Sequence, residues 1–212
     1  AATDPVFLAA SVSASSGQSV LDVGSGVGVA SLCLGARVSN LRLYGIELQR
    51  EYFLMSKHNA IENNINLKVV NANLNDLPAD FRQKSFDHVM TNPPYFATKT
   101  LSEPIAQGKS TANIENMSLN DWIFFSLKRL KSGGSFSIIH LTERLPDVLS
   151  SLSAYCGSIS IKPITSRKSQ PAKRIIVQGI KGSKGPMKLL EPFVVHDSDI
   201  HNSDISDYSK SA

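Results

Sequence analysis

From Ser19 onward, short apolar segments alternate with stretches whose apolar residues recur at helical spacing. The apolar segments are typical of buried strands and cover residues 20–23, 41–46, 67–70, 86–91, 135–140, 158–162 and 174–179. The helical spacing predicts helices over residues 29–38, 49–63, 118–131 and 143–155, with Ser118 as a cap and Gly133-Gly134 as a stop. This alternation predicts an α/β fold, in which helices cover both faces of a mostly parallel sheet.

Two segments fall outside this alternation. Residues 96–117 are polar and lack a regular period, and a connection of that length in a compact fold is a candidate lid or substrate loop. Residues 197–212 are acidic and rich in Ser and Asn, so we expect a flexible tail there. The sequence therefore predicts one domain over residues 1–196 and a tail after it.

The composition favours a single soluble domain. A chain of 212 residues that is 42% hydrophobic can bury its apolar surface in one core. No apolar run approaches the roughly 20 residues that cross a bilayer, and the first residues form no secretion signal, so we expect a cytoplasmic protein without a membrane partner. Cys33 and Cys156 are far apart and no histidines lie at ligand spacing, which predicts neither a disulfide nor a metal site. The sequence does not give the oligomeric state, and a monomer is favoured.

Positive charge is concentrated in one part of the chain, although the formal net charge is only +4. No Asp or Glu lies between Val148 and Leu190, whereas several Lys and Arg residues do. Such a block suits a phosphate backbone, because each cation placed near a phosphate releases a condensed counterion. A solvated basic face that binds nothing specific is the alternative. The candidate nucleic-acid contacts are Arg167, Lys168, Lys173, Arg174, Lys181 and Lys184.

A glycine-rich turn, Asp22-Val-Gly-Ser-Gly-Val-Gly28, follows the first predicted strand and opens a helix. Glycines there let the backbone approach a ligand closely, and the helix start offers unpaired N–H groups to an anionic group. The third glycine of the dinucleotide fingerprint is missing. The candidate ligand-binding residues are Asp22, Gly24, Ser25, Gly26 and Gly28, with a plain strand-to-helix turn as the alternative.

A carboxylate, Glu47, closes the second predicted strand. It can accept hydrogen bonds from both hydroxyls of a ribose, a feature common to nucleotide-type cofactors held at the switch point of an open sheet. A surface Glu that caps the following helix is the alternative.

The tetrapeptide Asn92-Pro93-Pro94-Tyr95 follows the fourth predicted strand, at the edge where open α/β sheets bind ligands. The two prolines fix the direction of the backbone. The Asn92 side-chain oxygen and the Pro93 carbonyl can then accept both hydrogens of one exocyclic NH2, while Tyr95 stacks on the attached ring. That grip would aim the nitrogen lone pair at a sulfonium methyl. All four residues are candidate catalytic residues, with a simple turn as the alternative.

Taken in order, the glycine turn, Glu47 and the Asn-Pro-Pro-Tyr motif resemble class I Rossmann-like methyltransferases that methylate amino groups with S-adenosylmethionine (SAM). Three further segments are similar to bacterial tRNA(Val) adenine-N6 methyltransferases: residues 4–10, residues 139–146 and the run from Pro171 to Lys184. The resemblance covers nearly the whole chain up to Asp197.

The resemblance implies a seven-stranded sheet whose last strand is antiparallel to the rest. It also implies SAM as the cofactor and S-adenosylhomocysteine as the product, with the glycine turn at the methionine part, Glu47 at the ribose and Asn73-Leu74 at the adenine. The implied cofactor contacts are Asp22, Gly24, Ser25, Gly26, Gly28, Glu47, Leu48, Asn73, Leu74 and Asn92.

Three departures from the family pattern stand out. Asn73 occupies a position where relatives usually carry Asp, so we expect its side-chain oxygen to keep one hydrogen bond to the adenine amine. Residues 112–115 lack the Arg-His pair expected before Glu115, which leaves the acceptor open. The chain also begins close to the first motif, so we expect an N-terminal stretch that helps enclose the cofactor to be missing.

The resemblance implies methylation of adenine in RNA, with tRNA as the favoured partner. The same tetrapeptide serves methylation of guanine in ribosomal RNA, adenine in DNA and glutamine in proteins, and the acid-free basic block favours nucleic acid among these. A SAM-binding RNA module without catalysis is a further alternative, disfavoured by Asn92 and Tyr95. A dehydrogenase is disfavoured by the missing glycine and by the tetrapeptide.

Overall fold

The structure is a computed structural model that describes residues 3–94 and 117–196. Its strands are β1 Ser19–Val23, β2 Arg42–Glu47, β3 Leu67–Asn71, β4 Phe86–Thr91, β5 Leu130–Leu141, β6 Cys156–Arg167, β7 Arg174–Lys181, β8 Lys188–Leu189 and β9 Phe193–His196. Its helices are α1 Asp4–Ser11, α2 Val29–Arg37, α3 Arg50–Glu62, α4 Ala79–Arg82, α5 Leu119–Lys128 and α6 Leu145–Ser153, with a 3-10 turn, η1 Thr142–Arg144, before α6.

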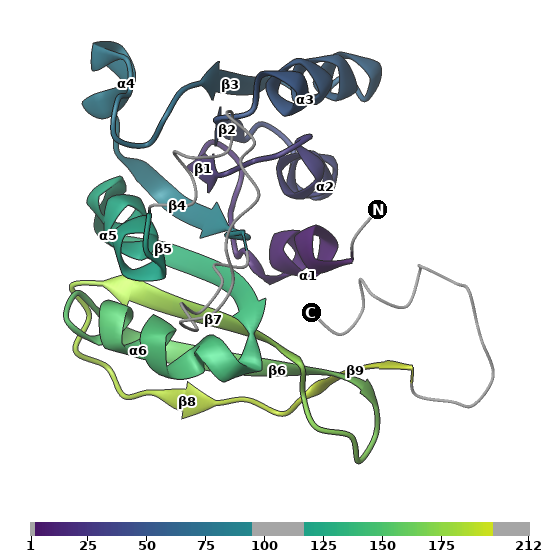
Figure 1. The fold of residues 1–212 in the computed structure, drawn as a ribbon, viewed down its shortest axis with the longest axis vertical. Helices are drawn as coiled ribbons and strands as arrows, with labels where there is room; N and C mark the ends of the chain where they lie inside the picture. The colour runs from purple at the N-terminus through teal and green to yellow at the C-terminus, as the bar shows by residue number, and fades with distance from the viewer. Residues whose placement is uncertain (1–2, 95–116, 197–212) are drawn as a thin grey trace, which may run out of the picture.

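One sheet runs through the molecule in the order β3-β2-β1-β4-β5-β7-β6, and both β8 and β9 pair with β6 (Figure 1). Strands β1 to β5 are mutually parallel, whereas β7 is antiparallel to both of its neighbours. The predicted seven-stranded sheet with an antiparallel last strand is thus confirmed for β1 to β7. The strand order reverses between β1 and β4, and ligands bind outside the carboxyl ends of strands at such a switch point.

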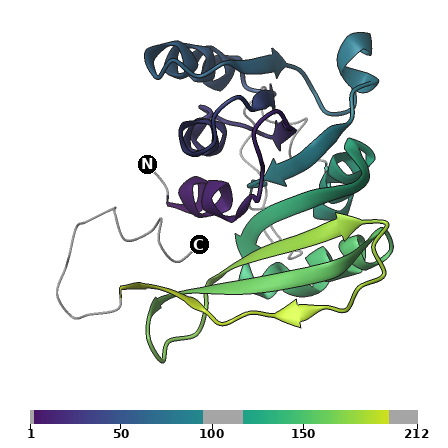
Figure 2. The same ribbon diagram turned by 180° about the vertical axis from the view of Figure 1, so that it is seen from behind.

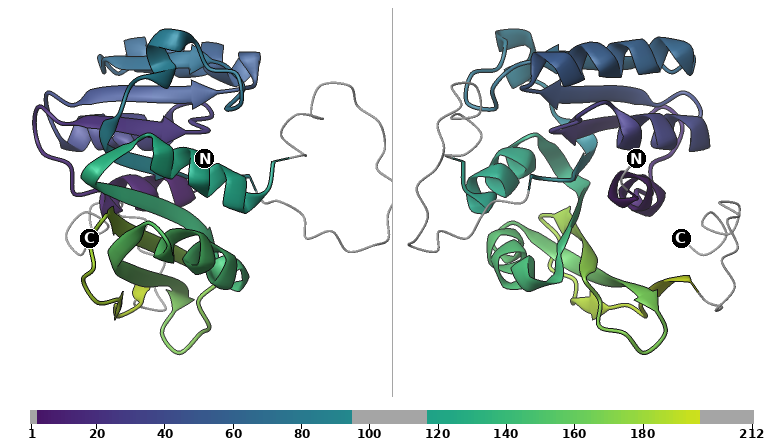
Figure 3. Two further views of the ribbon diagram at one scale, coloured as in Figure 1. Left: turned by 90° about the vertical axis from the view of Figure 1, so that its left-hand side faces the viewer. Right: turned by 45° about the vertical axis from the view of Figure 1, so that its right-hand side comes forward.

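Helices cover both faces of the sheet, as Figures 1 and 3 show. On one face, α1 and α2 contribute Leu8 and Leu34 to a core that α3 also joins. On the other face, α5 and α6 contribute Ile123 and Leu152 to a second core. Strand β1 lies between the two cores and every residue in it is buried, which explains its almost continuous apolar sequence.

Most predicted elements lie within a few residues of the observed ones, and Ser118 caps α5 as predicted, because its Oγ accepts a hydrogen bond from the Asp121 N–H at 3.1 Å. The predicted helix stop at Gly133-Gly134 is wrong. Helix α5 ends at Lys128, and both glycines lie inside β5, where the register with β4 shifts and Gly133 has a φ of +74°. A bulged strand and a helix end both use the left-handed backbone that glycine favours, so the sequence signal is the same.

Four short elements were not predicted: α1, α4, β8 and β9. Strands β8 and β9 follow one another along β6, beyond the seven-stranded sheet (Figure 2). Both are too short to show a periodic pattern, and Lys188 and Leu189 of β8 are exposed. Phe193 of β9 contacts Phe7 of α1, with ring centroids 5.5 Å apart, so these two elements are tied to each other across most of the sequence.

Helix α1 is held in place by side chains from distant parts of the chain. Its first residue, Asp4, forms an ion pair with Arg174 at the start of β7, with 2.9 Å between Oδ2 and Nε. Gln178 of the same strand donates a hydrogen bond from Nε2 to the Ser11 carbonyl at the other end of α1. The Arg37 guanidinium of α2 donates to carbonyls in the last turn. The position of α1 therefore depends on β7 and α2.

Candidate active site

A cavity of about 210 Å³ opens at the carboxyl ends of β1, β2 and β4. It brings together residues from three separate motifs of the sequence: the glycine turn, the end of β2 and the Asn-Pro-Pro-Tyr tetrapeptide. The predicted site residues that line it are Gly24, Gly26, Glu47, Leu48, Asn73, Leu74, Asn92 and Pro94. The other described residues of its lining are Ile46, Gln49, Tyr52, Ala72, Met117 and Trp122.

The glycine turn wraps around the end of β2. The backbone N–H groups of Gly24 and Ser25 both donate to the Ile46 carbonyl, at 3.0 Å each. Gly24 and Gly26 have φ values of +72° and +54°, in the left-handed region that favours glycine. At Gly26 a Cβ would meet nothing within 4 Å, so the missing side chain leaves space in the cavity.

Glu47 is almost fully buried, yet its carboxylate faces the cavity. The Gly26 N–H donates to Oε2 at 2.8 Å and the Gln49 N–H donates to Oε1 at 2.7 Å. Each oxygen keeps a lone pair for a further donor. The carboxylate is therefore fixed in orientation and able to accept two more hydrogen bonds.

Trp122 lies both in the hydrophobic core and in the wall of the cavity. It is 6% exposed, and its Nε1 donates to Thr91 Oγ1 at 2.8 Å. Thr91 in turn donates to the Val23 carbonyl at 2.8 Å. This chain of hydrogen bonds links α5, β4 and β1 at the cavity. The sequence signal for this role was a Trp in the first turn of α5, the next helix after the tetrapeptide.

Several predicted residues do not line the cavity. Asp22, Ser25 and Gly28 shape the turn from behind, and Pro93 is also absent from the lining. Tyr95 lies outside the described residues, as do residues 96–116 of the candidate loop, with residues 112–115 among them, and the tail, whereas Met117 at the end of the loop lines the cavity. The Asp22 carboxyl is 2% exposed and accepts a hydrogen bond from Ser31 Oγ at 2.9 Å.

Burial raises the pKa of Asp22 to about 7, and the nearby charge of Glu47 adds to this, while the hydrogen bonds from Ser31 oppose it. The pKa of Asp22 is thus raised by its place behind the turn, so this carboxyl keeps its proton to a higher pH than an ordinary Asp does.

Asn73 begins a tight turn over residues 73–76. Its Oδ1 accepts a hydrogen bond from the Asn75 N–H at 2.9 Å, and its backbone carbonyl accepts one from the Asp76 N–H at 2.9 Å. One lone pair of the side-chain oxygen is therefore already used within the turn.

The predicted basic residues divide between the two edges of the sheet. Strand β6 ends at Arg167 and β7 begins at Arg174, so the hairpin with Lys168 and Lys173 lies at the carboxyl edge, on the same side as the cavity. Strand β7 runs the other way, so Lys184 after its end lies at the amino edge. Lys173 and Lys184 are both exposed.

Arg174 and Lys181 are bonded to other described residues of the protein. Arg174 pairs with Asp4 of α1. The Lys181 ammonium donates to the carbonyls of Leu127 and Leu130, at 2.7 Å each, and so joins the end of α5 to the start of β5. Lys181 therefore has a structural role.

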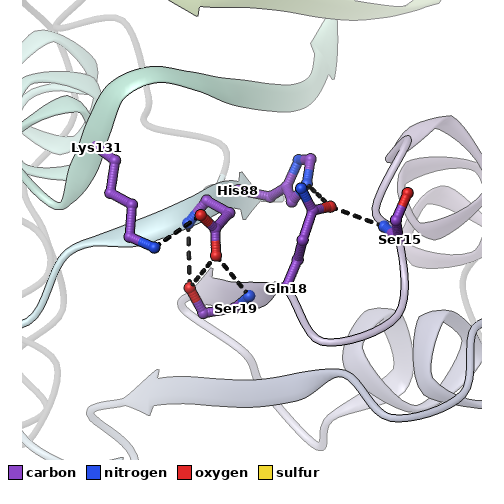
Figure 4. Close-up of polar contacts among 6 residues, drawn as sticks. Ser15, Gln18, Ser19, His88 and Lys131 are labelled. Atoms are coloured by element: carbon purple, nitrogen blue, oxygen red, sulfur yellow. Dashed lines mark hydrogen bonds and ion pairs between the residues drawn. The ribbon is translucent and has the colours of Figure 1, made fainter.

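A polar cluster lies at the amino edge of the sheet, away from the cavity (Figure 4). Asp87 accepts hydrogen bonds from the Ser19 N–H and hydroxyl and from the Lys131 ammonium. Burial alone would raise the pKa of Asp87, but these donors hold it well below its usual range. His88 bridges Gln18 and Ser135. Asp87, the second residue of β4, is thus a local hydrogen-bond partner.

Within residues 3–94 and 117–196, no helix is long and apolar enough to span a membrane. The same residues contain no group of three or more His, Cys, Asp or Glu side chains arranged for a metal ion.

Comparison with known proteins identifies the family. The family model described as the methyltransferase small domain matches residues 5–146, more than half of the chain. Two similar proteins are named tRNA1(Val) (adenine(37)-N6)-methyltransferase. The one from Actinobacillus pleuropneumoniae serotype 7 is 26% identical and covers 93% of this chain and 82% of its own length. The one from Trichodesmium erythraeum is 25% identical and covers 83% and 75%.

Solved structures agree on the fold. A predicted O-methyltransferase from Agrobacterium tumefaciens matches with a TM-score of 0.77 at 21% identity, over 97% of this chain and 95% of the other. A class I SAM-dependent methyltransferase from Listeria monocytogenes matches with a TM-score of 0.63 at 14% identity, over 91% and 63%. The chain therefore belongs to the methyltransferase small-domain family and is a SAM-dependent methyltransferase.

Proposed function

We propose that this enzyme transfers a methyl group from SAM to the exocyclic amino group of an adenine in RNA, with tRNA as its substrate. The two relatives described above are named for that reaction at adenine 37 of a tRNA. The observation that carries the proposal is the shared cavity, because Gly24, Gly26, Glu47 and Asn92 all line it. A cofactor on the glycine turn and an acceptor at Asn92 would therefore meet.

The residues around the cavity fit SAM. The two remaining lone pairs of Glu47 suit the neighbouring hydroxyls of a ribose. The N–H groups at the start of α2, behind Gly26, suit the carboxylate of the methionine part. Leu48 and Leu74 suit the faces of the adenine. When bound, SAM supplies the methyl group and leaves as S-adenosylhomocysteine.

The acceptor is held by the tetrapeptide in this proposal. The Asn92 side-chain oxygen and the Pro93 carbonyl accept the two hydrogens of the adenine NH2, and Pro94 keeps the backbone in the required direction. Tyr95, for which we propose stacking on the adenine ring, completes the grip. No strong base is needed, because an amino nitrogen attached to a purine loses its proton readily once methylation has made it cationic.

We propose that the RNA backbone crosses the carboxyl edge of the sheet, at the hairpin between β6 and β7. Arg167, Lys168 and Lys173 supply positive charge there. Arg174 contributes charge while it stays paired with Asp4. We leave Lys181 out of this surface because its ammonium is used by two carbonyls, and Lys184 out because it lies at the other edge.

A methylation assay tests the proposal. The enzyme is incubated with methyl-labelled SAM and, in parallel, with total tRNA, ribosomal RNA, DNA and protein from cells that lack its gene, and the labelled product is then digested and mapped. We expect label in tRNA, as N6-methyladenine. Label in ribosomal guanine, DNA adenine or protein glutamine would show that this group, and not an adenine of tRNA, is the acceptor. SAM binding without transfer to any of the four would favour a non-catalytic RNA module.

A further inference from the structure

A second cavity, of about 290 Å³, lies between α1 and the strands β6 and β7. Side chains of α1, α2, β6, β7 and β9 line it, so it is built from both ends of the chain. Among the described residues, it shares none with the cavity that contains Glu47 and Asn92. Ligand sites in proteins begin at roughly this size, so the second cavity suits a small molecule.

Much of the wall of the second cavity is apolar. Ile164 of β6 and Ile176 of β7 are buried members of the core on the α1 face, and Phe7 and Phe193 pack against that core. The two rings meet edge to face. A wall of this kind binds the apolar body of a ligand by removing its surface from water.

A lysine lies beside this apolar wall. Lys162 of β6 is directly opposite Ile176 in the pairing of β6 with β7, and it is two residues from Ile164, so all three side chains share one face of the sheet. Lys162 is half-buried and lines the second cavity. Its ammonium forms no hydrogen bond or ion pair with any residue that the structure describes.

The second charged residue of the lining is also basic. Arg37 of α2 is exposed and donates from Nη2 to the carbonyls of Ala9 and Val12, so its Nη1 is available to another acceptor. No Asp or Glu among the described residues lines the second cavity. The positive charge of the lining is therefore not balanced within the lining, and a negatively charged ligand would balance it.

We propose that the second cavity is a binding site for a small amphipathic anion, with an apolar body and one carboxylate or sulfonate group. The body lies against Ile164, Ile176, Phe7 and Phe193, and the anionic group pairs with Lys162. This site is separate from the proposed methyl-transfer site and does not depend on it. Because α1 forms one wall and β6 and β7 another, the bound anion also holds α1 against the sheet.

Fluorescence titration of the full chain with anilinonaphthalene sulfonate tests the proposal, since this apolar anion becomes fluorescent when it is buried. The titration is made with and without excess S-adenosylhomocysteine. We expect one saturable site per chain in both cases. Lys162→Met keeps an apolar side chain of similar length and removes the charge, so it should weaken binding about tenfold.

Lys188→Met is the matched control, because Lys188 is exposed on β8, next to β6, and does not line the second cavity. It should leave the affinity for the probe unchanged. Bound probe should also raise the Tm of the wild type as its concentration increases, and should do so much less in Lys162→Met.

Three results would overturn the inference. Equal affinities in Lys162→Met and the wild type would mean that the lysine does not hold the anion. Displacement of the probe by S-adenosylhomocysteine would place it in the other cavity. Absence of saturable binding, or binding that weakens as the protein concentration rises, would mean that the second cavity is closed to small anions by the chain itself or by a second copy.

These results differ from a failure of the proposed function. Loss of methyl transfer in the assay described above would leave probe binding in the second cavity unaffected.

Discussion

The indole ring of Trp122 packs directly on Gly24, where a Cβ would lie only 2.7 Å from Trp122 Cζ2. The ring cannot move aside freely, because its Nε1 is bonded to Thr91. Gly24→Ala should therefore lower the free energy of unfolding by about 2 kcal/mol, from the clash and from the strain of a positive φ. Urea unfolding followed by Trp122 fluorescence measures this.

Gly26→Ala is the comparison, because its φ is also positive but a Cβ there meets nothing within 4 Å. It should cost only about 1 kcal/mol of strain. Its Cβ would instead take up space in the cavity, so we expect the larger loss in SAM affinity from this variant. Equal stability losses in the two variants would mean that the contact between Gly24 and Trp122 is unimportant.

Asn92→Ala should separate binding from turnover. Asn92 is proposed to orient the acceptor amine, so its loss should leave SAM affinity within a few fold and lower kcat roughly 100-fold or more. Single-turnover methylation together with equilibrium binding of SAM measures both quantities. Weakened SAM binding with unchanged turnover would assign Asn92 to the cofactor rather than to the acceptor.

Asp22 should make stability depend on pH. Its pKa is raised to about 7 in the folded protein from an ordinary value of 3.8, so the folded state binds the proton more tightly than the unfolded state. The corresponding stability is complete below about pH 4 and is lost as the pH rises to about 7. Asp22→Asn removes this loss while an amide oxygen still accepts from Ser31.

The stability of Asp22→Asn relative to the wild type should therefore rise by about 3 kcal/mol between pH 4 and pH 7.5. Urea unfolding at a series of pH values measures the difference. Two parallel stability profiles would show that Asp22 does not titrate in this range.

Lys173→Ala should weaken RNA binding, because Lys173 lies in the β6–β7 hairpin at the edge that holds the cavity. We expect the affinity for RNA to fall a few fold. The plot of log K against log salt concentration has a negative slope, and we expect the magnitude of that slope to decrease by about 1. Lys184→Ala removes the same charge at the opposite edge and should leave the slope unchanged. If only Lys184→Ala reduced the slope, the RNA surface would lie at the amino edge.

The central strands could be predicted because they are buried on both faces. The predicted limits of β4 coincide with the observed strand Phe86–Thr91, although Asp87 and His88 interrupt its apolar residues. Helix α1 and strand β9 were not predicted, for a different reason. Each is short, and contacts with distant parts of the chain stabilise them, among them the contact between Phe7 and Phe193, which no local pattern reveals.

The candidate site likewise contains residues whose positions could be predicted from the sequence and residues whose positions could not. Gly24, Glu47 and Asn92 could be predicted to lie together because each follows a parallel strand, and the carboxyl ends of such strands meet at one edge. The cavity-lining position of Trp122 depends on how α5 crosses β4. The orientation of the Asn73 side-chain amide depends on a backbone N–H two residues away. Both are products of three-dimensional packing.

Strand β7 lies between β5 and β6 but comes after both in the chain. It also carries Arg174 and Gln178, which hold the two ends of α1. On a translating ribosome, residues 174–181 therefore complete the seven-stranded sheet and hold α1, which is synthesised well before them. Until they emerge, the growing chain presents the bare edge of β5 to its surroundings, a stage at which aggregation or a chaperone competes with folding.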